Sequence, residues 1–323
     1  MANLTARLGI AAAAILILAA VAARAQSDGF PTGPVKIVTQ QGPGGATMGT
    51  MRLVADQLGK RWRRPVLFVT EPGAGGAIAA KTVADAVPDG HTLFMALASA
   101  FVVLPETHKS LLFDIRQFTS VGFVGEVPMA IGVSPKLPVN SLKELIALSK
   151  QSADGLNVAA AFRGSLPDLT AELFRARSGA AITAIHYPGS AQAMTDIMSG
   201  RVPVLVDGLG GPLGNGQIKL LAVASPQRLR SHPQVPAIAE ALPGFAASGW
   251  FVLVAPPRTP LALANKINAD LRAVLAEPDV SEKYAELNTT TRDYSPEQVT
   301  DFIRAEQQLW TPVVQQLKLT EDH

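Results

Sequence analysis

The sequence predicts an α/β fold, and two observations carry that prediction. Short apolar runs typical of buried strands alternate with stretches of helical periodicity along most of the 323 residues, a pattern that specifies mixed, mainly parallel sheets flanked by helices. The composition, with 48% hydrophobic and 17% charged residues, is typical of a packed globular chain and excludes a disordered or coiled-coil protein. The length is sufficient for two lobes or one large domain.

The predicted strands are apolar runs short enough to be buried in a sheet. They span residues 35–40, 66–70, 92–97, 156–160, 182–187, 202–206, 218–224 and 250–255. The helices predicted between them span residues 47–60, 76–87, 142–151, 168–178 and 190–199. Ser141 with Glu144 fits a capping box at a helix start, and so does Ser295 with Gln298, where Pro296 suits the first helical position.

The C-terminal region is the most helical part of the sequence. Periodic apolar positions predict helices over residues 261–276, 279–287 and 296–316, which we expect to form a helical cap packed on a sheet. Pro312 is expected to kink or divide the last of them.

Two extended apolar segments without helical period, residues 121–133 and 248–255, predict the domain organisation. Two crossings, one outward and one back, are what a chain needs to insert one lobe into another. We therefore expect a first lobe of residues 26–127 plus 250–323, a second lobe of residues 128–249, and a ligand cleft between them, with each lobe near the usual domain size.

Residues 1–25 have the pattern of a cleaved secretory signal peptide. An uncharged run follows Arg7, and Ala23-Arg24-Ala25 fits the small-x-small pattern that predicts cleavage after Ala25. A permanent membrane anchor is the alternative, which the length barely allows. The chain has no cysteine, so neither disulfides nor a lipid-modified cysteine is expected, and the mature protein should be free outside the cytoplasm.

The charge balance predicts no nucleic-acid partner. Removal of residues 1–25 takes away two arginines and no acid, which leaves equal numbers of positive and negative side chains. The basic cluster at residues 60–64 (KRWRR) is too short to bind nucleic acid alone. We interpret it as the solvated C-terminal end of a helix, where cations suit the dipole.

Catalytic and metal-binding patterns are missing from the sequence. The five histidines show no pair at metal-ligand spacing, there is no thiol, and neither a nucleophile elbow nor a nucleotide-binding glycine pattern occurs. We expect no metal, no cofactor and no zinc or thiol enzyme. His186, beside Tyr187, is interpreted as structural because no nucleophile lies near it at a recognisable spacing.

Glycine-containing turns follow three of the predicted strands and precede helices. They lie at residues 42–47 (GPGGAT), 163–165 (RGS) and 188–190 (PGS). Glycine lets a ligand approach the backbone, and the free N–H groups of a helix N-terminus favour an anion, so each turn is a candidate carboxylate or phosphate site. The alternative is that they are only the tight turns that every α/β protein needs.

Two charged residues stand at the ends of apolar strands, where binding residues of parallel sheets tend to lie. Arg163 could bind a carboxylate in a bidentate manner through two of its guanidinium N–H groups, and Asp207 could accept a hydrogen bond from an amine, a hydroxyl or a water. A surface arginine and a capping aspartate are the alternatives.

Six segments in order resemble the solute-binding proteins of tripartite tricarboxylate transporters, the Bug-type receptors. They are residues 41–47 (QGPGGAT), 71–76 (EPGAGG), 88–93 (PDGHTL), 187–190 (YPGS), 242–245 (LPGF) and 250–256 (WFVLVAP). The resemblance runs from about Phe30 to Leu319 and covers nearly the whole mature chain.

The resemblance implies a two-lobed periplasmic binding protein fold of type II-like architecture, which closes on a small organic carboxylate and delivers it to membrane permease subunits. Such receptors usually act as monomers. It also implies a set of ligand-binding positions: Gln41, Gly44, Gly45, Ala46 and Thr47 in the first turn, Ala98, Ser99 and Ala100 after the third strand, and Arg163, Gly164, Ser165, Gly189, Ser190 and Asp207 in the second lobe.

The sequence departs from the family pattern at the predicted site. Gln41 replaces an aromatic residue, Met48 replaces an aspartate, and residues 160–168 replace a loop usually rich in Ser, Gly and Asn. Because that loop brings Phe162 and Leu166 toward the cleft beside Arg163, we expect a preference for an aromatic or longer-chain carboxylate. Two other functions stay open: an extracytoplasmic sensor feeding a two-component system, and an exported enzyme acting on carboxylated substrates.

Overall fold

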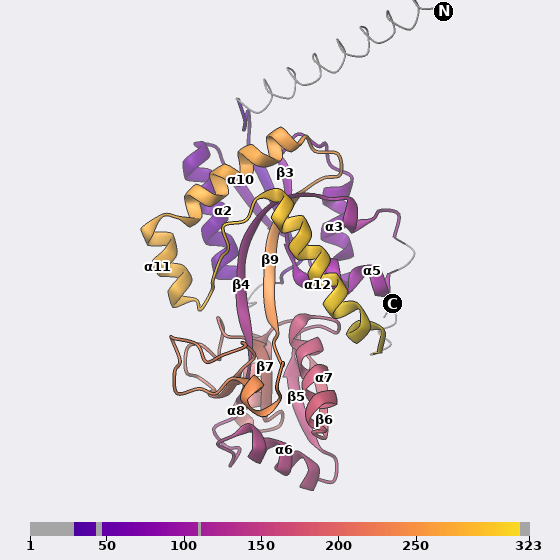
Figure 1. The fold of residues 1–323 in the computed structure, drawn as a ribbon, viewed down its shortest axis with the longest axis vertical. Helices are drawn as coiled ribbons and strands as arrows, with labels where there is room; N and C mark the ends of the chain where they lie inside the picture. Colours follow the sequence, from indigo (N-terminus) through magenta and orange to yellow (C-terminus); the bar gives the residue numbers. More distant parts are fainter. Residues whose placement is uncertain (1–28, 43–46, 109–110, 317–323) are drawn as a thin grey trace, which may run out of the picture.

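The protein folds into two lobes connected by two long strands (Figure 1). The computed structural model describes residues 29–42, 47–108 and 111–316. Their strands form one continuous path in the order β2-β1-β3-β9-β4-β7-β5-β6, with β8 paired to β4. The predicted α/β class and two-lobed fold are therefore confirmed. Among the described residues, no helix has both the length and the apolar character needed to cross a membrane.

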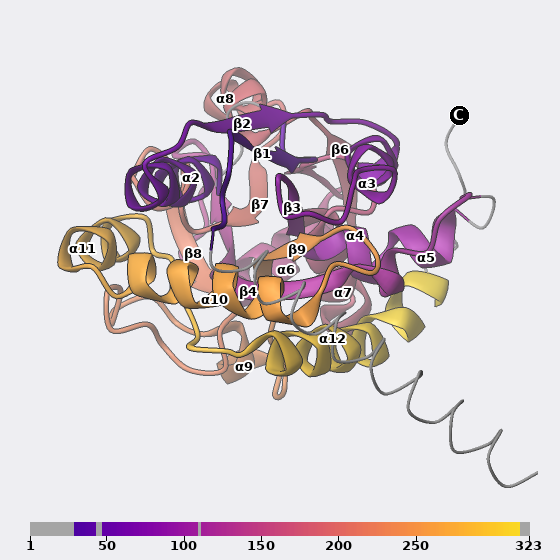
Figure 2. The same ribbon diagram turned by 90° about the horizontal axis from the view of Figure 1, so that it is seen from above.

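The first lobe is built on three parallel strands, β1 (Val35–Thr39), β2 (Val66–Thr70) and β3 (Thr92–Leu97), followed by antiparallel β9 (Ser248–Ala255). Its helices are α2 (Met48–Trp62), α3 (Ala77–Ala84), α4 (Ala98–Val102), α5 (Leu104–Thr107), α10 (Leu261–Leu275), α11 (Pro278–Glu286) and α12 (Pro296–Gln316). Because alternate residues of a strand face opposite ways, Ile37 belongs to a core cluster with residues of α2 and α10, while Val38 belongs to another with residues of α3 and α12. Figure 2 shows α2 and α3 on opposite sides of β1.

The second lobe has the same layered design. Parallel strands β6 (Ile182–His186), β5 (Leu156–Ala160) and β7 (Val204–Gly208) lie side by side, and β8 (Lys219–Val223) completes the sheet beside β4. Helices α6 (Leu142–Gln151), α7 (Leu166–Ser178), α8 (Ser190–Ser199) and α9 (Ile238–Ala241) surround them. The connections from β5 to α7 and from β6 to α8 are therefore tight turns at the carboxyl ends of parallel strands.

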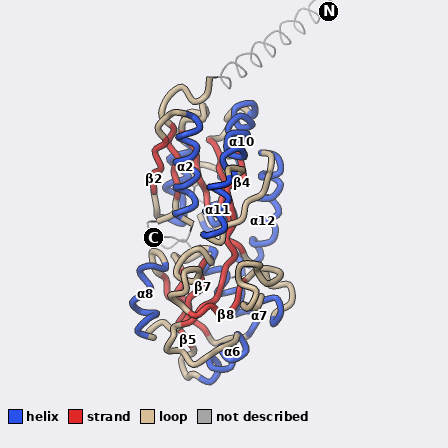
Figure 3. The backbone as a smooth tube through the Cα atoms, turned by 90° about the vertical axis from the view of Figure 1, so that its left-hand side faces the viewer, coloured by secondary structure: helices blue, strands red, loops and turns tan. Residues whose placement is uncertain are grey.

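Strand β4 (Thr119–Val133) belongs to both sheets. Residues 119–128 pair with β9, and residues 129–133 pair with β7 and β8. Figure 3 shows this strand running from one lobe into the other. The extended segments expected at residues 121–133 and 248–255 are thus confirmed as strands.

Pro312 does not divide the last helix, because α12 continues through it, and the burial of Trp310 and Val314 offsets the N–H donor that proline removes. The alternative, a kink at Pro312, stays a prediction. The basic cluster is confirmed as the C-terminal end of α2, where all four of its basic residues are exposed. Trp62 within it is buried, and both Arg61 and Trp62 donate hydrogen bonds to Asp270. The short helices α4 and α5 were not predicted from the sequence.

Both predicted helix starts are confirmed. Ser295 and Gln298 form a complete capping box, in which each side chain accepts the other residue's backbone N–H. Ser141 accepts the N–H of Glu144, whereas the Glu144 carboxylate accepts the N–H of Asn140 instead of that of Ser141. The N-terminus of α6 is therefore capped by Ser141, and the reciprocal hydrogen bond of the capping box goes to the backbone one residue earlier.

Candidate functional site

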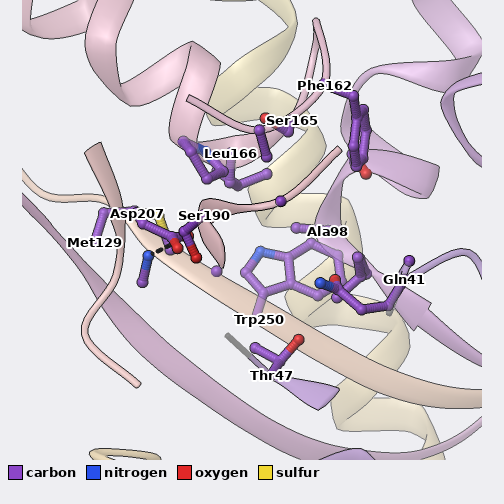
Figure 4. Close-up of a pocket in the computed structure, with 18 of the residues that line it drawn as sticks. Gln41, Thr47, Ala98, Met129, Phe162, Ser165, Leu166, Ser190, Asp207 and Trp250 are labelled. Carbon is purple, nitrogen blue, oxygen red and sulfur yellow. Dashed lines mark hydrogen bonds between the residues drawn. The ribbon is translucent and has the colours of Figure 1, made fainter. Parts of the chain in front are cut away.

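A pocket lies where the carboxyl ends of β1 and β3 meet those of β5, β6 and β7 (Figure 4). It contains about 670 Å³ of space free of protein atoms, part of which is open to solvent. The lining residues are Gln41, Gly42, Thr47, Leu97, Ala98, Ser99, Met129, Ala161, Phe162, Ser165, Leu166, Pro167, Pro188, Gly189, Ser190, Asp207, Gly208, Gly249 and Trp250. Both lobes thus contribute to the same cavity.

Three helices of ten residues or more begin at this pocket. Thr47 is the N-cap of α2, Ser165 is the N-cap of α7, and Ser190 is the first residue of α8. The first N–H groups of a helix have no partner within the helix, and the helix dipole gives that end a positive potential. The convergence of three such ends creates a positive potential without a cationic side chain, which suits a bound anion.

The three hydroxyl groups at these helix starts are not equivalent. Ser165 Oγ accepts the backbone N–H of Asp168 at 3.3 Å, so it caps its own helix. Thr47 Oγ1 and Ser190 Oγ are buried, and neither has a hydrogen-bond partner among the described residues. A buried polar group without a partner is costly, so these two hydroxyls are candidates for ligand contact.

Asp207 is the one ionisable side chain among the described residues that line the pocket. It lies in β7, is 9% exposed, and its Oδ1 accepts the N–H of Gly208 at 2.8 Å. Burial raises the pKa of Asp207, and the neighbouring Ser190 hydroxyl and the Gly208 N–H oppose that shift. Although Ser190 lies close enough to act on this carboxyl, its hydroxyl does not meet hydrogen-bonding geometry there.

The rest of the pocket is largely apolar. Trp250 is fully buried, and its indole N–H donates to Glu306 Oε2 at 2.7 Å, so its polar atom is satisfied outside the pocket. Its ring stacks on Phe101 with the centroids 6.1 Å apart. Met129, Phe162 and Leu166 supply further apolar surface (Figure 4). The pocket therefore suits a ligand that has an apolar body as well as an anionic group.

The structure brings most of the predicted site residues together. Eight of them line the pocket: Gln41, Thr47, Ala98, Ser99, Ser165, Gly189, Ser190 and Asp207. Three others, Gly44, Gly45 and Ala46, lie outside the described residues. Ala100 and Gly164 are buried but do not line the pocket.

Arg163 does not line the pocket either, and it is exposed. The expected cationic contact in the cleft is therefore absent from the described lining. The physical reason is the tight turn after β5, in which Gly164 has a φ of 78° and its N–H donates to Asp168 Oδ2 at 2.8 Å. His186 Nε2 lies 2.8 Å from Asp168 Oδ1, so His186 contacts the residue that holds this turn.

Sequence reasoning missed the residues that long strands contribute to the pocket. Met129 lies in β4, while Gly249 and Trp250 lie in β9, and all three are inside strands instead of at strand-to-helix turns. The extended segments that predicted the crossings between the lobes were the available signal, because a cleft between two lobes must be bordered by the strands that connect them.

The fold and the pocket define a class of protein, the two-lobed periplasmic binding proteins. Residues 50–319 match the family described as the tripartite tricarboxylate transporter family receptor. The chain is 36% identical to a UPF0065 protein of Bordetella bronchiseptica over 283 residues, which cover 86% of this chain and 83% of the other. It is 32% identical to BugT of Bordetella pertussis over 325 residues and 98% of each chain.

Solved structures agree with this relationship. The periplasmic binding protein BugD superposes with a TM-score of 0.82 at 27% identity, covering 90% of this chain and 99% of the other. Rpa4515 of R. palustris with adipate gives a TM-score of 0.83 at 30% identity, covering 88% and 97%. MatC of Rhodopseudomonas palustris with bound malate gives 0.81 at 28% identity, covering 88% and 100%. The chain belongs to the tripartite tricarboxylate transporter receptor family and is a periplasmic solute-binding protein.

Proposed function

We propose that this protein captures a small organic carboxylate in the pocket and delivers it to the membrane permease subunits of a tripartite tricarboxylate-type transporter. The observation that carries the proposal is the meeting of three helix N-termini with the unpartnered, buried hydroxyls of Thr47 and Ser190. The adipate and malate in the related structures are both carboxylates, which supports the same ligand class here.

The anionic group is held by backbone N–H groups and the Thr47 hydroxyl, because the described lining contains no arginine or lysine. The apolar surface of Trp250, Phe162 and Leu166 favours an aromatic or longer-chain carboxylate over a small polar one. Ligand binding favours a closed arrangement of the lobes, because only a closed pocket contacts the ligand from both sides.

The proposed function includes a localisation, an oligomeric state and a division of the chain into lobes. The signal peptide is cleaved after Ala25, and the mature receptor acts in the periplasm as a monomer without catalysis. The first lobe comprises residues 26–127 plus 250–323, and the second comprises residues 128–249. Gly44, Gly45 and Ala46, which lie outside the described residues, remain proposed ligand-binding positions.

Thermal unfolding against a panel of mono-, di- and tricarboxylates tests the binding function. A ligand at a hundredfold excess over its dissociation constant adds about 2.7 kcal/mol of stability, which raises the Tm by a few degrees for a chain of this size. We expect a selective increase, larger for phenylalkanoates than for citrate. No increase with any acid, together with no carboxylate detected by mass spectrometry of the denatured protein, would contradict the proposal.

A further inference from the structure

The pocket contains a buried acid that nothing in the described chain neutralises. Asp207 is 9% exposed and lines the pocket, and no lysine, arginine or histidine shares that lining among the described residues. The lining includes Gln41 and Gly42, and the sequence that follows them, Pro-Gly-Gly-Ala at residues 43–46, also carries no cationic side chain. A cationic partner for this carboxyl is thus missing from the described pocket.

The hydrogen bonding of Asp207 is equally incomplete. One bond is made to it within the described residues, from the Gly208 N–H to Oδ1, so Oδ2 retains its capacity to accept. The buried Asp168 nearby is different, since it accepts the Gly164 N–H on one oxygen and contacts His186 with the other. A lone buried carboxyl lowers stability, and such a group persists where function requires it.

Asp207 and Ser190 lie together on one side of the Trp250 indole ring, with Gln41 on the other side in the view of Figure 4. A ligand carboxylate placed directly against Asp207 would be repelled by it. The carboxylate is better placed toward Gln41 and Thr47 at the start of α2, which leaves the Asp207 side of the pocket for a different group.

We infer that Asp207 is a specificity-determining residue that accepts a hydrogen bond from a hydroxyl or ammonium group on the carboxylate ligand. The ligand class is then a hydroxy or amino carboxylate with an apolar body. Ser190, whose hydroxyl has no partner among the described residues, contacts the same substituent. This inference rests on the proposed function, because it assumes that the pocket binds carboxylates.

Two matched series of acids test the inference by calorimetry on the mature protein. The first is 3-phenylpropionate, 3-phenyllactate and phenylalanine; the second is succinate, malate and aspartate, with both enantiomers of each chiral acid. Within a series only one substituent changes, from hydrogen to hydroxyl to ammonium. We expect a substituted member to bind about tenfold to a hundredfold more tightly than its unsubstituted parent.

Variants separate a role of Asp207 in selection from a role in folding. Asp207→Asn keeps a carbonyl acceptor but removes the charge, so it should abolish a preference for ammonium while retaining part of a preference for hydroxyl. Asp207→Ala should abolish both. Asp154→Asn is the matched control, because Asp154 is exposed, lies in the same lobe and does not line the pocket. Asp207→Asn should not lower the Tm, since that change removes a buried charge without a cation.

The outcomes separate this inference from the proposed function. Equal binding of parent and substituted acids by the wild type would overturn the inference and leave the proposed function intact. Discrimination that survives in both Asp207 variants would also overturn it. Binding of none of these acids would overturn the inference, and the proposed function fails as well if the wider carboxylate panel is also inactive.

Discussion

Two buried aspartates with nearly the same exposure, Asp270 in the first lobe and Asp207 in the pocket, have opposite surroundings. Asp270 is 6% exposed and accepts hydrogen bonds from Arg61 at 3.0 Å, Trp62 at 2.8 Å and Lys266 at 2.5 Å. Asp207 is 9% exposed and accepts one hydrogen bond within the described residues, from the backbone of its neighbour Gly208.

The difference in partners sets the direction of each pKa. Burial opposes ionisation of Asp270, but its bonds from Lys266, Trp62 and Arg61 outweigh that effect and lower its pKa. For Asp207 burial dominates and raises the pKa. Since the two side chains are chemically identical, the comparison distinguishes an acid that joins α2 to α10 from an acid that the fold leaves available to a ligand.

The largest effect on stability is expected for Asp270→Asn. The change weakens three hydrogen bonds to a buried charged acceptor, and we expect the free energy of unfolding to fall by about 2 kcal/mol. Denaturant titration of the mature protein measures it. Asp207→Asn is the matched control and should show no loss, so a similar decrease in both variants would contradict the distinction drawn between them.

The next effect concerns ligand affinity at the unpartnered hydroxyls. Ser190→Ala should weaken carboxylate binding about tenfold, which is about 1.4 kcal/mol, because one hydrogen bond to the ligand is lost. Thr47→Ser, which keeps a hydroxyl, should bind more tightly than Thr47→Ala. Calorimetry with the best acid of the panel gives both values, and unchanged affinity in both alanine variants would remove these groups from the site.

A smaller effect on stability is expected for Ser165→Ala. Ser165 Oγ accepts the N–H of Asp168 and caps α7, so its loss should cost about 1 kcal/mol of unfolding free energy. Ser190→Ala should leave stability nearly unchanged, because its hydroxyl bonds to no described residue. A reversed order of the two Tm values would show that the hydroxyls have been assigned the wrong roles.

The smallest effects are the opposite pH dependences of the two aspartates. Because Asp270 has a folded-state pKa below the usual 3.8, its contribution is present above that pH and is lost as the pH falls through the folded value. Asp207 has a folded-state pKa above 3.8, so the wild type loses stability relative to Asp207→Asn as the pH rises through that value. Tm profiles of wild type and both variants from about pH 3 to pH 8 measure these trends, and parallel profiles would refute them.

Local patterns predicted the secondary structure well. The strand ranges 66–70, 92–97 and 156–160 and the helix ranges 142–151 and 190–199 agree with the structure at both ends. A division of the last helix at Pro312 was one predicted alternative, and it does not occur, because tertiary burial of the flanking apolar residues outweighs the local cost of proline. The pairing of Asp270 with Arg61 could not be predicted, because 209 residues separate the partners.

The candidate site also contains some residues that local sequence patterns predicted and others whose place depends on the tertiary structure. Gly189, Ser190 and Ser165 were predictable, because a turn that follows a strand and starts a helix leaves a local signature in the sequence. Trp250 and Met129 carried no such signature, since their place in the pocket depends on where β4 and β9 pass between the lobes. Arg163 is not part of the described lining, and its place could not be predicted, because a charge at a strand end does not reveal which way the following turn directs the chain.

The sequence by itself determined the α/β class, most of the helix and strand boundaries and the glycine-containing turns, because these depend on periodicity and backbone preference over a few neighbouring residues. Only the tertiary structure decided which polar groups find partners. Asp270 is neutralised by Arg61 from the distant end of α2 and by Lys266 of its own helix, whereas Asp207, Thr47 and Ser190 meet in a pocket without a cation among its described residues. Whether a buried polar group finds a hydrogen-bond partner depends on which residues, often distant in the sequence, lie beside it in the folded chain. This difference separates the residues that stabilise the fold from those that we propose contact the ligand.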